Sequence, residues 1–345
     1  MDYIKFGGGP TVSRIIKGCW QMSAGHGAGA TGEAAVEELL AFYDAGITTF
    51  DGGDIYTGVE ELFGHFRKEC LQQRGEEAQK HLRFHTKFVP DLEALPTMNR
   101  QYVERVIDRS LERIGVDCLD LVQFHWWDFD IPGHVETAHH LAALQQAGKI
   151  KNIGVTNYDT VHLDQTVRSG VTVVSNQVQY SAIDRRPQKT MLDFCAANHI
   201  YLLYYGSLAG GFLSEHYLGK ANPGEPFVNR SLIKYKLVID DNGGWSRFQF
   251  LLQTLKQIAG KHGVTIPSVA MALLLNDRPS AAVIAGGSAR HLPDMMAARR
   301  IRLDTTDMIC IHEAAPEELP GDVYELERQK GGKHAAIMRY DLNQI

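Results

Sequence analysis

Residues 119–157 read LDLVQFHWWDFDIPGHVETAHHLAALQQAGKIKNIGVTN and contain one copy of the structural unit that recurs along the chain. Two short runs rich in Val, Ile, Leu and Phe, at 119–126 and 150–157, enclose a segment of helical periodicity at 134–149. Gly148 lies where the C-terminal cap of that helix is expected. A strand, a helix and a second strand in this order predict a βαβ unit with parallel strands.

The same alternation extends over most of the chain. Eight apolar runs are interpreted as strands, at residues 15–20, 48–53, 82–88, 119–126, 150–157, 173–180, 200–206 and 281–287. The clearest helices span 32–46, 99–116 and 134–149. Eight strand–helix units are the number that a closed barrel requires. We therefore predict an α/β fold, a single (β/α)8 TIM barrel domain over residues 1–345, with an insertion after strand 7 (about 213–246) and a C-terminal tail after about 303.

A doubly wound open sheet is the alternative to the barrel. Such a sheet normally carries a glycine-rich phosphate-binding turn early in the chain. The only early candidate, GGGP at 7–10, precedes the first strand and lacks the GxGxxG spacing. This favours the barrel.

Composition narrows the function classes. The 345 residues are 44% hydrophobic and 22% charged, which is enough apolar surface for a full core. A formal net charge of −6 provides no electrostatic footprint for nucleic acid. The N-terminus lacks a secretory apolar region and no run approaches a membrane span. We therefore expect a cytoplasmic protein without nucleic-acid or membrane partners.

The five cysteines, Cys19, Cys70, Cys118, Cys195 and Cys310, are scattered and form no CxxC pair. This pattern is typical of reduced thiols and not of a disulfide framework or a zinc site. The histidines at 134, 139 and 140 have no acidic or cysteine partner at metal spacing, so we interpret them as surface residues and expect no metal.

Polar side chains follow the strands at their carboxyl ends, where a barrel places its active-site loops. Asp51, Lys87 and His125 end three successive strands, and Tyr56 lies in the loop after Asp51. An ammonium beside a phenol lowers the pKa of the phenol, and a carboxylate keeps a buried ammonium charged. The imidazole is expected to donate a hydrogen bond to a substrate carbonyl. Taken singly, each group is more simply a solvated charge or a core histidine; their conjunction favours a site.

Five motifs in order resemble the aldo-keto reductase family. FDGGDIYTGVEELFG (50–64) is similar to its FDTAxxYGxxExxxG segment, HTKF (85–88) to its lysine strand, and DLVQFHWW (120–127) to its DLxxxHW segment. GKIKNIGVTNY (148–158) is similar to GKIRxIGVSNF, and SNQVQYSAIDRRP (175–187) to the NQxxYS strand. The resemblance extends from about residue 15 to about residue 295.

The resemblance implies a role for each matching residue. Tyr56 would be the general acid/base, Lys87 and Asp51 its tuning pair, and His125 the carbonyl-orienting group. Implied cofactor-binding residues are Thr156, Asn157 and Gln177 on the carboxamide, Tyr205 on the nicotinamide ring, and further along Ser207, Leu208, Gly286, Ser288 and Arg290. Substrate walls would be Trp20, Trp126 and Trp127.

The cofactor loop departs from the family pattern. Gly286 and Gly287 fall near a usual Lys and Ser, and the seventh-strand turn reads YYGSLAGG where YSPLxxG is commoner. Ser288 and Arg290 remain suited to a 2′-phosphate, because arginine binds phosphate through two parallel hydrogen bonds. We expect NADP(H) to be favoured, with NAD(H) as the alternative.

Together these features predict an NAD(P)(H)-dependent oxidoreductase that reduces a small-molecule aldehyde or ketone, including a sugar-derived carbonyl, with Tyr56 as general acid. One alternative is an NAD-dependent sugar or alcohol dehydrogenase working toward oxidation. Another is a cofactor-binding regulatory subunit, against which the intact Asp–Tyr–Lys–His set weighs.

Overall fold

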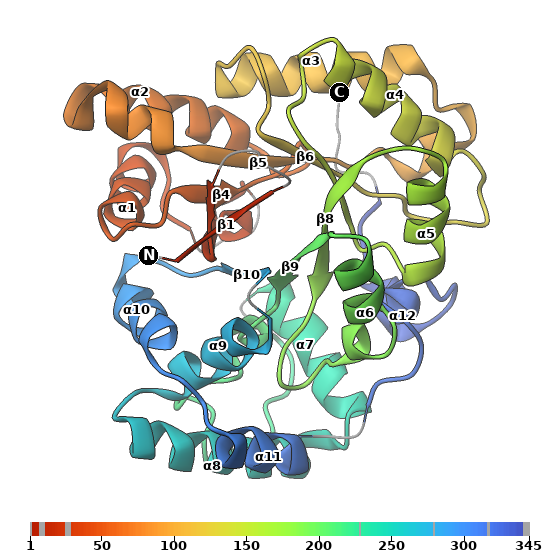
Figure 1. The fold of residues 1–345 in the computed structure, drawn as a ribbon. Helices are drawn as coiled ribbons and strands as arrows, with labels where there is room; N and C mark the ends of the chain where they lie inside the picture. Colours follow the sequence, from red (N-terminus) through yellow and green to blue (C-terminus); the bar gives the residue numbers. More distant parts are fainter. Residues whose placement is uncertain are drawn as a thin grey trace.

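Eight parallel strands close into a barrel in the computed structural model, which describes residues 2–6, 11–24, 29–227, 229–278, 280–315 and 318–340 (Figure 1). The strands are β3 (Ile15–Gly18), β4 (Thr49–Asp51), β5 (Arg83–Phe88), β6 (Leu121–Phe124), β7 (Ile153–Thr156), β8 (Val173–Gln179), β9 (Tyr201–Tyr205) and β10 (Ala281–Ala285). Strand β10 pairs with both β9 and β3, which closes the ring. The predicted barrel and all its strands are confirmed; the GGGP stretch at 7–10 lies outside the described residues.

Helices surround the barrel and cover its outer face (Figure 1). Those of the repeating units are α1 (Gly32–Asp44), α2 (Val59–His81), α3 (Arg100–Ile114), α4 (His134–Gln146), α5 (Thr160–Arg168), α6 (Met191–Ala197), α9 (Ile266–Asp277) and α10 (Leu292–Arg300). Short 3-10 turns are η1 (Trp20–Met22), η2 (Leu92–Thr97), η3 (Arg186–Gln188), η4 (Ala209–Gly211) and η5 (Ala289–His291). The helices predicted at 32–46, 99–116 and 134–149 are thus confirmed.

Helix α3 illustrates why these segments are helical. The Asn99 side chain accepts a hydrogen bond from the Tyr102 amide at the N-terminus, and Gly115 ends the helix with φ 71°. Its buried residues recur on one face, at Val103, Val106, Ile107, Ser110 and Ile114. Burial of that face against the barrel supplies most of the helix's stability, since short isolated helices are marginal in water.

A hairpin that the sequence analysis did not anticipate closes the amino end of the barrel. It consists of β1 (Tyr3–Lys5) and β2 (Thr11–Ser13) in antiparallel register. Phe6 is 1% exposed, and its ring centroid lies 5.0 Å from that of Tyr201, the first residue of β9. The hairpin therefore seals the end opposite to the expected site.

The remaining helices lie in the predicted tail and in the segment after β9, which extends past the predicted end of the insertion at about 246 to His262. Helices α7 (Arg230–Asp241) and α8 (Gly244–His262) precede α9, and the tail carries α11 (Thr305–Ala314), α12 (Glu325–Arg328) and α13 (Lys333–Ala336). The tail returns to the carboxyl mouth of the barrel: Arg328 donates hydrogen bonds to the carbonyl oxygens of Asn157 (2.7 Å) and Trp126 (3.1 Å). That all 345 residues form one domain stays a prediction.

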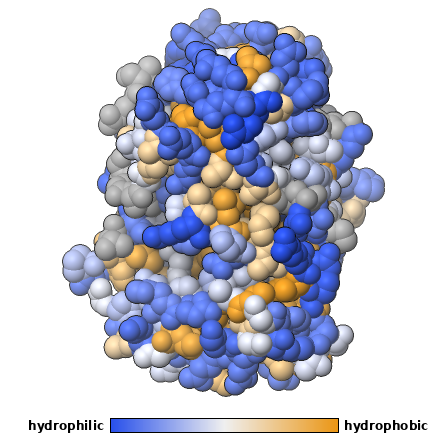
Figure 2. All heavy atoms as spheres, turned by 90° about the vertical axis from the view of Figure 1, so that its left-hand side faces the viewer, coloured by the Kyte–Doolittle hydropathy of each residue, from blue (hydrophilic) through white to orange (hydrophobic). Residues whose placement is uncertain are grey.

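The face that carries α1, α2 and α10 is mainly hydrophilic, with apolar patches near its middle (Figure 2). Among the described residues, no single helix has the length and apolarity to cross a membrane. Helices α8 and α9 would meet that test only when taken together, and they are bent by 88°.

A buried ion cluster anchors the tail to the barrel. Arg186 bonds Asp184 at 2.8 Å and Glu327 at 3.0 Å, and all three side chains are almost fully buried. Burial alone would raise the pKa of Glu327, but Arg186 and Lys234 outweigh it and hold that pKa at about 2. A depressed carboxyl pKa stabilises the folded state above the unfolded pKa, and this contribution is lost as pH falls toward the folded pKa.

Substituting Glu327→Gln should therefore lower the free energy of unfolding at pH 7 by about 3 kcal/mol, because it removes one partner of a buried pair. It should also flatten the pH dependence of stability between pH 4.5 and about 2. Urea unfolding followed across that range checks both effects, with exposed Glu318→Gln in the same tail as control. Equal acid sensitivity of Glu327→Gln and wild type would contradict the assignment.

Candidate active site

The Asp51 carboxylate is the centre of a polar layer inside the barrel. It accepts hydrogen bonds from Lys87 Nζ (2.7 Å), Gln123 Nε2 (2.7 Å) and Gln177 Nε2 (2.8 Å). These side chains come from β4, β5, β6 and β8, whose alternate residues face the barrel interior. Four strands are therefore joined through one carboxylate at their carboxyl ends.

Gln123 is a site residue that is not among those predicted from the sequence motifs. A signal was present, because Gln123 lies two residues before His125 and a strand's side chains alternate between its faces. Its side-chain oxygen accepts a hydrogen bond from Gln177 at 2.7 Å, so the two amides also hold each other.

The Lys87 ammonium lies between Asp51 and Tyr56. Its Nζ donates to the Gly52 carbonyl oxygen at 2.6 Å and is 4.6 Å from the Tyr56 ring centroid. Burial alone would lower the pKa of Lys87, but Asp51 and Tyr56 raise it on balance. The lysine therefore stays charged, as expected from the sequence.

Tyr56 differs from the expectation in one respect. Burial raises the pKa of its phenol, while the Lys87 charge and a hydrogen bond from Lys87 oppose that rise without reversing it. The phenol is therefore protonated at neutral pH. The expected lowering by Lys87 is present only as this partial compensation.

His125 is held in one tautomer. Its Nδ1 lies 3.1 Å from the Thr156 carbonyl oxygen, which only accepts, so Nδ1 carries the proton. Burial lowers the pKa of His125 to about 3, which leaves the ring neutral. Nε2 is buried and has no partner among the described residues. In this tautomer Nε2 is an acceptor. Donation from Nε2 to a substrate carbonyl requires the other tautomer, and that expected role stays a prediction.

A cavity of about 1160 Å³ opens over this layer. Expected site residues that line it are Trp20, Asp51, Tyr56, Lys87, His125, Trp127, Thr156, Asn157, Gln177, Tyr205, Ser207, Leu208, Gly286, Ser288 and Arg290. These side chains therefore line one cavity, as predicted from the sequence. The catalytic or binding role of each residue stays a prediction.

Trp126 is the exception and corrects the prediction. Its side chain is fully buried and its indole donates to the Ile131 carbonyl oxygen at 2.9 Å. Neighbouring residues of an extended segment point to opposite sides, so His125 and Trp127 face the mouth while Trp126 packs against Phe124. Trp127 lies against His125, with ring centroids 4.3 Å apart.

The residues expected at the nicotinamide form hydrogen bonds with one another. The Tyr205 hydroxyl donates to Asn157 Oδ1 at 2.8 Å, and the Thr156 hydroxyl donates to the Gln177 carbonyl oxygen at 3.2 Å. Asn157 has φ 61°, a left-handed conformation that asparagine adopts more readily than most residues. The side chains of Thr156, Asn157, Gln177 and Tyr205 therefore lie next to one another in the cavity wall.

The loop after β10 forms the other end of the cavity. Ser288 is the N-cap of η5, and Arg290 is the second residue of that short helix. Lys17 of β3, which sequence analysis passed over, is 1% exposed and donates to the Gly287 carbonyl oxygen. It also lies 3.5 Å from Glu38 of α1. Lys17 therefore connects strand β3 to the loop after β10.

The tail supplies residues that no sequence motif indicated. Tyr324 and Met338 line the cavity, and the Tyr324 ring centroid lies 5.6 Å from that of His125. Lys234 of the insertion also lines it. These residues follow the matching motifs or fall between them, so only the fold brings them to the mouth.

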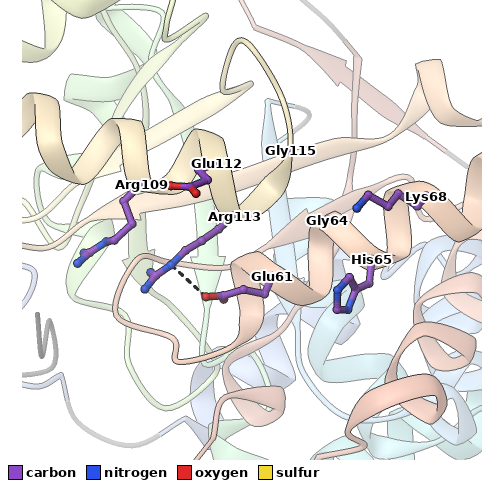
Figure 3. Close-up of a pocket in the computed structure, with 8 residues that line it drawn as sticks. All are labelled: Glu61, Gly64, His65, Lys68, Arg109, Glu112, Arg113 and Gly115. Carbon is purple, nitrogen blue, oxygen red and sulfur yellow. Dashed lines mark ion pairs between the residues drawn. The ribbon is translucent and has the colours of Figure 1, made fainter.

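Two further grooves lie on the outer surface. One, between α2 and α3, is lined by charges of both signs, and Arg113 Nε forms a 3.0 Å ion pair with Glu61 (Figure 3). The other is lined by His139 and His140 of α4 and by His134. His134 is buried, which corrects its interpretation as a surface residue. Within the described residues, no group of three or more potential metal ligands was found.

Comparisons with known proteins place the chain in a family. Residues 14–315 match the model of the Aldo/keto reductase family, which covers most of the chain. A crystal structure of a thermostable aldo-keto reductase with the inhibitor epalrestat has a TM-score of 0.69 and 27% identity, covering 91% of this chain and 100% of that one.

Three curated relatives are similar to this chain, and two of them carry different cofactors in their names. Aldo-keto reductase YhdN of Bacillus subtilis is 31% identical over 60% of this chain, which spans only 61% of that protein. The NADH-specific methylglyoxal reductase of Escherichia coli is 26% identical over 66% of this chain and 68% of its own length. The aldo-keto reductase yakc of Schizosaccharomyces pombe, named with NADP(+), is 26% identical over 89% of each chain.

The Asp51–Lys87 pair makes a testable prediction about stability. Asp51→Asn should lower the free energy of unfolding by about 3–5 kcal/mol, because it leaves a buried ammonium without its counter-charge. Lys87→Met combined with Asp51→Asn should cost less than the two single substitutions added together. Urea unfolding of the four proteins checks the cycle; strictly additive losses would show that the two side chains are not coupled.

Proposed function

We propose that this chain, which belongs to the aldo/keto reductase family, reduces the carbonyl group of a small aldehyde or ketone with a nicotinamide cofactor, favouring NADP(H) over NAD(H). One observation carries the proposal. A phenol, Tyr56, lies 4.6 Å from a buried ammonium in a cavity that also holds a neutral imidazole with an open nitrogen. The phenol can donate a proton to a substrate oxygen and the ammonium stabilises the phenolate that remains, while the imidazole nitrogen can accept a hydrogen bond from the hydroxyl that forms.

Each of the four side chains has a distinct task in the proposed reaction. Tyr56 holds the proton that the substrate oxygen receives, and the burial that raises its pKa keeps that proton in place at neutral pH. Lys87 stabilises the phenolate that remains, and Asp51 keeps Lys87 charged. His125 Nε2 accepts a hydrogen bond from the new hydroxyl and so orients the alcohol.

The cavity suits a dinucleotide, which would supply the hydride when bound. It is continuous from Tyr56 to Arg290, and the buried Gln21 Oε1 in its wall has no partner among the described residues. Thr156, Asn157, Gln177 and Tyr205 would hold the nicotinamide end. Ser207, Leu208 and Gly286 would line the path between the two ends, and Ser288 and Arg290 would bind the 2′-phosphate.

The preference for NADP(H) is supported by the cationic end of the cavity. Arg290 lines it in the first turn of η5, and Lys17 lies beneath the loop. The relatives include members named for NADH and for NADP(+), so the relatives alone favour neither cofactor.

Oxidation of a sugar or other alcohol with NAD⁺ is a second candidate, favoured by one observation. The His125 tautomer presents an acceptor, and a hydroxyl group donates to it whereas a carbonyl does not. The reduction proposal assigns the same contact to the alcohol product, so the contact alone leaves the physiological direction open.

Substituting Tyr56→Phe should lower turnover of a simple aldehyde by about 10²–10⁴-fold, because it removes the general acid while retaining the ring. The affinity for NADPH should change little. Stopped-flow turnover and fluorescence titration of the reduced cofactor measure the two quantities. Turnover equal to wild type would exclude Tyr56 as the proton donor, and a wild type that binds cofactor without any turnover would favour the regulatory-subunit alternative.

Substituting Arg290→Ala should weaken NADPH binding about tenfold or more and leave NADH binding nearly unchanged, since a charge-assisted phosphate contact contributes about 1.5–3 kcal/mol. Wild type should bind NADPH at least as tightly as NADH. Cofactor titrations of wild type, Arg290→Ala and the control Arg300→Ala test this. Equal affinities in wild type, unaltered by either substitution, would support the NAD-linked alternative instead.

A further inference from the structure

A second cation reaches the cavity from the insertion and has no role in the proposed hydride transfer. Lys234 of α7 lines the cavity with a side chain that is 16% exposed. Its Nζ lies 5.1 Å from the Tyr205 ring centroid and 5.5 Å from that of Tyr324. Tyr324 in turn lies against His125. The ring of Tyr324, a residue of the C-terminal tail, therefore lies between the Lys234 ammonium and His125.

The neighbours of Lys234 lie too far from its ammonium group to form strong hydrogen bonds with it. Its acidic neighbour, Glu327, is 3.7 Å away. Both oxygens of that carboxylate already accept hydrogen bonds from Arg186, at 3.0 and 3.2 Å. The remaining hydrogen bond, to the Tyr205 hydroxyl, is 3.5 Å long. An ammonium has three donors and prefers anionic oxygens at about 2.7–2.9 Å, so the site can accept a further anion.

The surroundings limit what that anion can be. The rings of Tyr205 and Tyr324 flank the ammonium, and its side chain is only 16% exposed, a burial that also lowers its pKa. An anionic oxygen in such a place gains more from the charge than it would at an exposed lysine. The 2′-phosphate end proposed for the cofactor is formed by the loop after β10, whereas Lys234 contacts the tail through Tyr324 and Glu327.

We propose that Lys234 anchors an acidic group, a carboxylate or a phosphate, carried by the carbonyl substrate. The inference rests on the proposed function and deepens it, because it names the substrate class as short carbonyl compounds that carry an acid. Tyr324 forms the wall between the anchored acid and His125. Lys234 acts in recognition only; no proton or hydride passes through it.

Matched aldehydes test this inference. With NADPH as reductant, 4-carboxybenzaldehyde is compared with its neutral methyl ester in wild type, Lys234→Met, Lys234→Arg and the control Lys236→Met, which lies on the same helix and pairs with Asp240. Lys234→Met should raise the KM for the acid about tenfold or more and leave kcat for the ester nearly unchanged. Lys234→Arg should retain part of the preference, and Lys236→Met all of it.

Two binding measurements distinguish the remaining outcomes. Calorimetric titration with benzoate and with benzamide should show benzoate binding to wild type and its loss in Lys234→Met, whether or not any aldehyde is reduced. Fluorescence titration should give unaltered NADPH affinity in Lys234→Met. If NADPH affinity falls instead, the anion at Lys234 is a cofactor phosphate and the inference is wrong. If acid and ester, or benzoate and benzamide, are affected equally, Lys234 is only a structural partner of Glu327. Failure of wild type to reduce either aldehyde would count against the proposed function alone.

Discussion

The site depends on one buried carboxylate. Asp51 is 3% exposed and accepts three hydrogen bonds, from Lys87, Gln123 and Gln177. A buried charge is tolerated only when it is paired and its lone pairs are satisfied, and here the partners come from three other strands. The pair therefore fixes the relative position of the strand ends and keeps an ammonium beside Tyr56. Loss of the Asp51 charge would therefore alter both the packing of the barrel interior and the pKa of the Tyr56 phenol.

The barrel and the convergence of polar groups could be predicted from the sequence because both depend on periodicity. Buried parallel strands are continuous apolar runs, and their carboxyl ends meet at one mouth, so Asp51, Lys87 and His125 had to lie close together. The family match over residues 14–315 agrees with the resemblance that the motifs indicated. Arg290 could be located at the mouth because it lies in the loop region that follows the last barrel strand, β10.

The features that could not be predicted depend on tertiary contacts. Of the two adjacent tryptophans, only Trp127 faces the mouth, because the direction in which the chain leaves β6 turns Trp126 away from it. Trp126 is buried and donates to the Ile131 carbonyl oxygen. The tail reaches the mouth through Arg328 and Glu327, whose partners are far away in sequence. The His125 tautomer depends on a backbone carbonyl, that of Thr156, which carries no sequence signal. Burial, which raises the pKa of Tyr56, likewise follows from the fold and not from neighbouring residues.

The central claim is that Lys87, held charged by Asp51, controls the protonation of Tyr56. The most direct measurement is the pH dependence of kcat/KM for carbonyl reduction in wild type and in Lys87→Met. The rate falls at alkaline pH where the general acid loses its proton. Because the Lys87 charge opposes the rise in the pKa of Tyr56, its removal should move this alkaline limb to higher pH and lower the plateau at neutral pH. An alkaline limb at the same pH in both proteins would contradict the account.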